Sequence, residues 1–246
     1  MKSLIIFIVA AAAVVVGAAY WTSTTTEVTA SPSPSAQVSP TPPPTVLEDG
    51  TYKLDPGKSG MAWQGQKTLI VTWIDRGTIN LKDGAVTVKE GKAASGNVVV
   101  DMASITTVST GKGKDEMQMA THLKSADFFY VKKYPTAEFT LTSLEKDASS
   151  PDGYTVAGTL KLKGITNPVT FPATVSIDDN TLTMKASVQL DRTRWNVRYG
   201  SNKFFDNLGD NVIDDNFAVT FTAVATKVPT TPMPSVSGTP KVTPTK

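Results

Sequence analysis

The chain has 246 residues, one histidine, no cysteine and a formal net charge of +2. Without cysteine it can form neither a disulfide framework nor a thiolate metal site. The nearly neutral charge gives no indication of nucleic-acid binding, which usually shows as a clustered basic face.

The first segment, residues 1–21, is hydrophobic. Leu4 to Trp21 reads LIIFIVAAAAVVVGAAYW, and Lys2 is the one charge before it. This length lies between a signal-peptide core of about 7–15 residues and a spanning helix of about 17–25. Gly17-Ala18-Ala19 suits a cleavage site, whereas Tyr20 and Trp21 suit the membrane interface of an uncleaved anchor. We therefore expect an N-terminal hydrophobic helix, either signal anchor or signal peptide, and export of everything after it.

Two segments rich in Pro, Ser and Thr flank the middle of the chain. Residues 22–46 and 228–246 bury too little apolar surface to fold, so we expect a linker and a disordered tail. Residues 47–227 remain, which is enough for one all-β domain with a core.

Alternating apolar and polar residues predict strands through this domain. The apolar positions are Phe139, Leu141; Tyr154, Val156, Leu160, Leu162; Val169, Phe171, Val175, Ile177; Leu182, Met184, Val188, Leu190; and Phe217, Val219, Phe221. Asp83-Gly84, Asp152-Gly153 and Asp179-Asn180 are predicted turns.

About eight strands are predicted, each with one apolar face, as in an antiparallel sheet with water on one side. Only residues 112–123 read as a short helix. With so little helix to cover it, the sheet must cover itself as a sandwich or a closed barrel. The alternation alone does not separate these two architectures.

Candidate catalytic and metal-binding residues are few. One histidine without cysteine does not supply a zinc site, and Asp206, Asp210, Asp214 and Asp215 lack the spacing of a calcium loop. An enzyme acting on a lipid headgroup would have to use His122, with Asp127 near it in sequence. We expect no catalytic constellation, metal or cofactor.

Residues 191–208, DRTRWNVRYGSNKFFDNL, combine three arginines with four aromatic residues. One interpretation is a long loop that caps the domain with aromatic plugs. The other is the mouth of a binding site, with arginines for an anionic headgroup and aromatic rings for an apolar stem. The two interpretations are compatible.

Four segments are similar to one known family. GTYKLDPGKSGMAWQG (50–65), HLKSADFFYVKKYPTAEF (122–139), GTLKLKGITNPVTFP (158–172) and residues 192–221 occur in the order typical of the YceI-like polyisoprenoid-binding family. Tyr130 departs from that pattern, since an acidic residue is common there. The resemblance implies a lipocalin-like, eight-stranded antiparallel barrel in an exported bacterial protein, with an apolar cavity for an isoprenoid chain. The interior of an eight-stranded barrel can hold one small ligand.

The resulting hypothesis is a binding module, not an enzyme, for an isoprenoid lipid such as a polyprenyl phosphate or an isoprenoid quinone. We expect His122, Arg194 and Arg198 to contact its headgroup. The predicted contacts to the apolar chain are Phe139, Leu141, Val156, Leu160, Phe171, Val175, Met184, Val188, Trp195, Tyr199, Phe204, Phe217 and Phe221. Three alternatives stay open: a barrel filled by its own side chains, an enzyme using His122, and a stalked surface interaction protein with an exposed apolar patch and no cavity.

Overall fold

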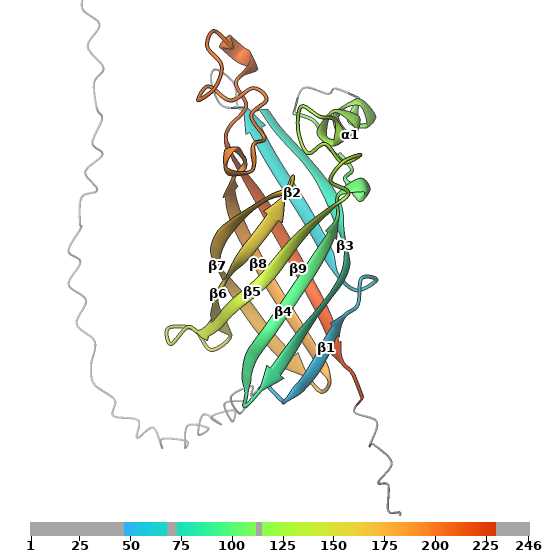
Figure 1. Cartoon of the computed structure of the whole chain (residues 1–246), viewed down its shortest axis with the longest axis vertical. Helices are drawn as coiled ribbons and strands as arrows, with labels where there is room; N and C mark the ends of the chain where they lie inside the picture. Colours follow the sequence, from blue (N-terminus) through green and yellow to red (C-terminus); the bar gives the residue numbers. More distant parts are fainter. Residues whose placement is uncertain (1–46, 68–72, 112–114, 230–246) are drawn as a thin grey trace, which may run out of the picture. The chain divides into compact units, whose positions relative to one another are not determined.

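The computed structural model describes residues 47–67, 73–111 and 115–229. Nine antiparallel strands form one sheet in the order β1-β3-β2-β9-β8-β7-β6-β5-β4, and β3 also pairs with β4, which closes the sheet (Figure 1). Their bounds are β1 Gly50–Leu54, β2 Gly60–Lys67, β3 Trp73–Lys89, β4 Lys92–Asp101, β5 Thr136–Lys146, β6 Gly153–Leu162, β7 Ile165–Asp178, β8 Thr181–Asp191 and β9 Asn216–Lys227. The architecture is therefore a closed barrel and not a sandwich.

The nine strands occupy eight positions around the barrel. Both β1 and β2 lie between β3 and β9: β1 pairs with the end of β3 at Ala85–Val88, and β2 with its start at Trp73–Ile79. They are two halves of one wall position, interrupted at residues 55–59. Counted by wall positions, the barrel is eight-stranded and antiparallel, which confirms the prediction from the sequence.

One predicted turn is wrong. Asp83-Gly84 lies inside β3, where the register against β4 shifts between Leu81 and Asp83. A Cβ on Gly84 would come within 2.7 Å of the Asn97 carbonyl oxygen, so glycine permits a close approach of the two strands instead of a reversal. The chain turns at Glu90-Gly91, where both residues have positive φ, as a two-residue hairpin requires.

The short helix α1 spans Glu116–Lys124, slightly later than the predicted 112–123, of which residues 112–114 lie outside the described part. Asp115 sets its start, because its carboxylate accepts the backbone N–H groups of Met117 and Gln118. Short 3₁₀ turns follow β4 (Met102–Ser104) and β8 (Arg192–Trp195), and a third spans Gly209–Asn211.

The two ends of the barrel differ. One end, which we call the mouth, carries α1, the end of β2, the start of β3 and the β6–β7 and β8–β9 connections (Figure 1). At the other, closed end, a buried cluster forms around Tyr52, which has no exposed surface and donates its hydroxyl hydrogen bond to the Glu48 carbonyl. The rest of this cluster is Leu47, Val88, Val175, Leu182 and Ala225.

No helix among the described residues is long and apolar enough to span a membrane. The hydrophobic helix expected at 1–21, the linker at 22–46 and the tail beyond residue 229 lie outside the described residues. Those expectations stay predictions.

Candidate functional site: an apolar cavity inside the barrel

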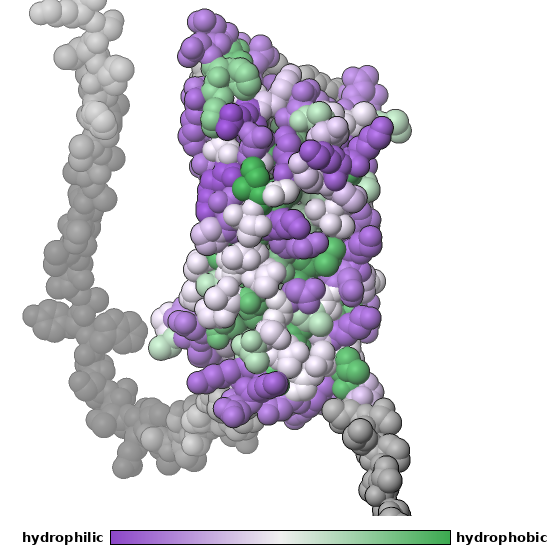
Figure 2. Space-filling model, viewed as in Figure 1, coloured by the Kyte–Doolittle hydropathy of each residue, from purple (hydrophilic) through white to green (hydrophobic). Residues whose placement is uncertain are grey.

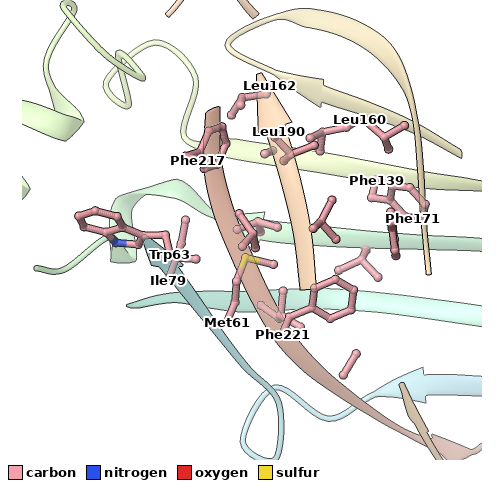
Figure 3. A pocket seen from close by; sticks show the side chains of 18 of the residues that line it. Met61, Trp63, Ile79, Phe139, Leu160, Leu162, Phe171, Leu190, Phe217 and Phe221 are labelled. Atoms are coloured by element: carbon pink, nitrogen blue, oxygen red, sulfur yellow. The ribbon is translucent and has the colours of Figure 1, made fainter. Parts of the chain in front are cut away.

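A cavity of about 320 Å³ lies inside the barrel, and every strand contributes to its wall. The alternation of apolar and polar residues along the strands predicted many of the residues in this wall. The predicted contacts that line it are Phe139, Leu141, Val156, Leu160, Phe171, Val175, Met184, Val188, Phe217 and Phe221. Figure 3 shows Phe139, Leu160, Phe171, Phe217 and Phe221 around one space. What these residues bind stays a prediction.

Three phenylalanines form an aromatic tier across the cavity. The Phe171 ring lies 5.8 Å from that of Phe139 and 6.0 Å from that of Phe221, so one ring of β7 bridges β5 and β9. Gly158 on β6 makes room for this tier, because a Cβ there would lie 2.5 Å from Cζ of Phe139 and 2.4 Å from the Thr140 carbonyl. These edge-on and tilted contacts are favourable aromatic geometries.

Several lining residues were not predicted. Met61, Trp63 and Ile79 line the cavity from β2 and β3 (Figure 3), and Met119 and Leu123 reach it from α1. The strand residues carry a usable signal, since Ile79 and Leu81 alternate with polar neighbours, and Met61 and Trp63 alternate with the small residues Gly60 and Ala62. The helix residues carry no comparable signal, because a helix of nine residues shows too little periodicity.

Gly65 leaves a gap in the cavity wall. It follows Met61 and Trp63 at the spacing of one strand face and lines the cavity opposite Asp75. A Cβ built on it would meet no atom within 4 Å. Because Gly65 also lines the cavity, this open position marks space that a ligand can use and a larger side chain could block.

Most polar residues of the wall lie at the mouth. Gln66, Lys67, Asp75, Arg192 and Asp214 line the cavity there, whereas farther from the mouth the polar lining residues are Tyr52 and Asn97. Gln66 donates a side-chain hydrogen bond to Asp214 at 2.8 Å, and its carbonyl accepts the Asp214 N–H at 2.9 Å. This pair joins β2 to the β8–β9 connection at the rim.

Arg192 organises the β8–β9 connection. Its guanidinium is buried and donates to the carbonyl oxygens of Asp214, Val197, Tyr199 and Ile213 at 2.8–3.0 Å, with Asp215 at 3.5 Å. Burial lowers the pKa of Arg192, and the neighbouring carboxylates oppose that shift. In the sequence, Arg192 looks like Arg194 and Arg198, so its role in holding the loop was not predicted.

Lys203 reinforces the same connection from outside. Its ammonium lies 3.1 Å from a carboxylate oxygen of Asp191 and 3.1 Å from one of Asp215. Burial alone would raise the pKa of Asp191, but hydrogen bonds from Thr193 and Lys203 outweigh it and lower the pKa below its ordinary value. Hydrogen bonds to both carboxylates raise the pKa of Lys203.

Trp195 and Arg194 belong to the wall and not to the cavity lining. Trp195 is fully buried, and its indole N–H donates to the Leu160 carbonyl at 2.9 Å. Arg194 donates to the Pro168 carbonyl and lies over the Trp195 ring, on the outside. Both residues fasten the 3₁₀ turn after β8 onto β6 and β7.

The remaining predicted contacts lie on the outer surface of the mouth. The Arg198 guanidinium lies 4.4 Å from the Phe204 ring centroid, and Tyr199 and Phe204 are 44% and 42% exposed. His122 makes edge-on contacts with Phe128 and Tyr199 and lies 3.2 Å from Asp127. The pair that an enzyme would use is therefore formed, but neither residue is among those that line the cavity.

The described residues also contain no cluster of three His, Asp or Glu that could hold a metal ion.

Comparison with known proteins decides the family. The YceI-like domain model matches residues 52–225, which is most of the chain and nearly the whole barrel. The chain belongs to the YceI-like family. UPF0312 protein YE1254 of Yersinia enterocolitica is 35% identical over 132 residues, which cover 52% of this chain and 63% of that protein. Protein YceI of Escherichia coli is 39% identical over 99 residues, 39% of this chain and 47% of that protein. The chain thus aligns with about half to two thirds of the length of these relatives.

Solved structures agree with the YceI-like fold. BcnA of Burkholderia cenocepacia has a TM-score of 0.55 at 26% identity, covering 70% of this chain and 99% of that one. A polyisoprenoid binding domain from Saccharophagus degradans, implicated in plant cell wall breakdown, has a TM-score of 0.53 at 16% identity, with 74% and 100% covered. The second likeness is evidence for the fold alone.

Proposed function

We propose that this YceI-like barrel binds an isoprenoid-type lipid, with the apolar chain inside the barrel and the headgroup at the mouth. The observation that carries the proposal is the cavity, whose wall is mainly apolar and has most of its polar residues at the mouth. Each methylene moved from water into such a cavity contributes about 0.8 kcal/mol, so a long chain binds tightly without one strong polar contact. The fold is shared with a domain described as polyisoprenoid-binding, and the empty space argues against a barrel filled by its own side chains.

The rim favours an uncharged headgroup, such as a quinone, over a polyprenyl phosphate. Of the cations there, Arg192 already donates to four backbone carbonyls, and Lys67 faces a wall that also carries Asp75 and Asp214. Arg194, Arg198 and His122, the expected partners of an anionic headgroup, have partners on the outer surface. A phosphate would therefore meet nearby carboxylates without a free arginine to pair with.

The test is mass spectrometry of an organic extract of the purified chain, compared with Gly65→Trp. This variant fills the gap at Gly65, and displacing even two methylenes should lower lipid content about tenfold. Ala62→Trp, on the exposed face of the same strand, is the matched control and should keep its lipid. The extract should contain a quinone-type lipid. If wild type holds no lipid and takes up neither isoprenoid quinones nor polyprenyl phosphates, the proposal fails.

We also propose that the barrel lies outside the cytoplasmic membrane, tethered by an uncleaved 1–21 helix. The length of the apolar run Leu4 to Trp21 and the position of Lys2 support this orientation. The intact chain should fractionate with membranes, and protease added from outside should cut within residues 22–45. A mature protein that begins near Tyr20 and stays in the soluble fraction would replace the anchor by a cleaved signal.

A further inference from the structure

Exposed apolar side chains gather at the mouth of the barrel. Among the described residues, eight large apolar residues are exposed, and seven of them lie at this end in α1, at the start of β7 or in the connections; Val228 is the exception. The seven are Val108, Met117, Tyr130, Ile165, Tyr199, Phe204 and Phe205. Figure 2 shows apolar surface over the β8–β9 connection at this end, bordered by hydrophilic residues.

Three segments, 122–134, 163–165 and 194–205, form one continuous face that we call the mouth patch. Lys163 joins them, because its ammonium donates to the carbonyls of Ala126 and Asn196. A second contact, between the rings of His122 and Tyr199 at 4.7 Å, joins the first and third segments directly. The exposed Tyr130, Ile165, Tyr199, Phe204 and Phe205 therefore belong to a single surface.

The mouth patch is strongly basic, although the whole chain is nearly neutral. Its three segments contain seven Lys or Arg residues and one acidic residue, Asp127. Lys203 is ion-paired with Asp191 and Asp215. No ion pair with a carboxylate is found among the described residues for the other six cations, Lys124, Lys132, Lys133, Lys163, Arg194 and Arg198, although Lys163, Arg194 and Arg198 contact carbonyls or rings. Four to eight basic residues with interspersed aromatic rings form a surface that suits anionic lipid headgroups and the interfacial zone beneath them.

Tyr130 adds a second observation. Its φ is +48°, a left-handed conformation that bulky residues rarely adopt, and its side chain is 37% exposed. An Asn would fit this backbone better, and the ring packs on the protein only through an edge-on contact with Tyr134 at 6.1 Å among the ring contacts of the described residues. An amphipathic ring that stays exposed suits a membrane interface.

We propose that the mouth patch docks onto an anionic lipid bilayer, so that the cavity opening faces the membrane surface. The basic residues provide attraction to the headgroups, and the exposed rings enter the interfacial layer. A lipid would then pass between bilayer and cavity with little exposure to water. This inference goes beyond lipid binding and does not depend on which lipid fills the cavity.

The absence of cysteine permits a direct test with the full chain. Phe205→Cys at the mouth and Val228→Cys at the closed end, both on exposed residues, are each labelled with an environment-sensitive fluorophore. On vesicles of phosphatidylcholine with phosphatidylglycerol, the label at 205 should brighten and be quenched by lipid-borne quenchers, whereas the label at 228 should not. On phosphatidylcholine alone, the response at 205 should fall severalfold.

Two sets of variants separate docking from folding. Lys132→Glu with Lys133→Glu should lower the response at 205 severalfold, and Lys161→Glu with Lys185→Glu, on exposed wall positions, should not. Tyr130→Asn should lower the response while keeping or raising the melting temperature, which a misfolded variant would not do. Equal responses at 205 and 228, or no response at 205 on vesicle-bound chain, would overturn the proposal. Self-quenching of the 205 label without vesicles would also overturn it, and would assign the patch to a second copy of the chain.

Discussion

At the scale of single residues, Phe171 is the clearest probe of the cavity. It is 8% exposed, lies in the aromatic tier and faces inward from β7. We expect Phe171→Asp to abolish co-purification of lipid, because a carboxylate in the apolar interior carries a large desolvation cost. Lipid content per folded barrel, measured by extraction after a circular dichroism check, gives the answer. Thr170→Asp, on the exposed face of the same strand, should leave lipid content unchanged, and an equal loss in both variants would contradict the inward-facing role of Phe171.

Residue roles were predictable where the strand period determines them. A period of two assigns Val156, Phe171 and Val188 to the inner face without knowledge of the fold, and all three line the cavity. It cannot tell which arginine of the 191–208 segment is buried, because burial there depends on contacts among residues of an irregular loop. Arg192, Arg194 and Arg198 look alike in sequence, yet only the first is enclosed by backbone carbonyls.

At the scale of elements, the β8–β9 connection depends on Arg192. Replacing it with Met would remove the guanidinium donor from four buried or partly buried carbonyl oxygens and would take away the buried cation beside Asp215. We expect Arg192→Met to lower the free energy of unfolding by about 3–5 kcal/mol, measured by urea denaturation. Arg194→Met removes one hydrogen bond at an exposed site and should cost about 1 kcal/mol. Similar losses in the two variants would show that Arg192 is not the organising residue.

The same connection should weaken in acid. The folded-state pKa of Asp191 is lowered, so its contribution to stability is complete above the ordinary value near 3.8 and is lost as pH falls through the folded-state pKa. Stability should therefore fall more steeply on acidification below about pH 4 in wild type than in Asp191→Asn. Urea midpoints across that pH range measure this difference. Parallel pH profiles would mean that the Asp191 hydrogen bonds contribute little.

The strands themselves could be predicted more completely than their connections. Alternation indicated eight positions, yet it could not show that Gly60–Lys67 and Gly50–Leu54 share one of them, because that depends on pairing with β3 and β9. Asp83-Gly84 has the composition of a turn and became a bulge, since the surrounding residues of β3 pair with β4 on both sides. Local turn chemistry was overridden there by long-range pairing.

At the scale of the whole molecule, the closed end sets the minimum folded fragment. Leu47 is 6% exposed, Glu48 accepts the Tyr52 hydroxyl and pairs with Lys227, and the Asp49 carboxylate accepts the Gly91 N–H. Residues 47–229 should fold cooperatively with strand-type circular dichroism. A fragment beginning at Gly50 should melt about 5–10 °C lower, because it loses one buried leucine and a buried hydroxyl partner. Equal melting temperatures would place the domain boundary later than Leu47.

The buried cluster around Tyr52 also makes the barrel a blind tube. Whatever occupies it must leave by the way it entered, so an incoming molecule cannot push the resident one out of the far side. Replacement should then be a first-order process whose rate is independent of the competitor concentration, with release at the mouth as the slow step. A tube of this kind can keep its cargo for long periods in a medium rich in similar molecules, and it delivers that cargo only where the mouth itself meets an acceptor.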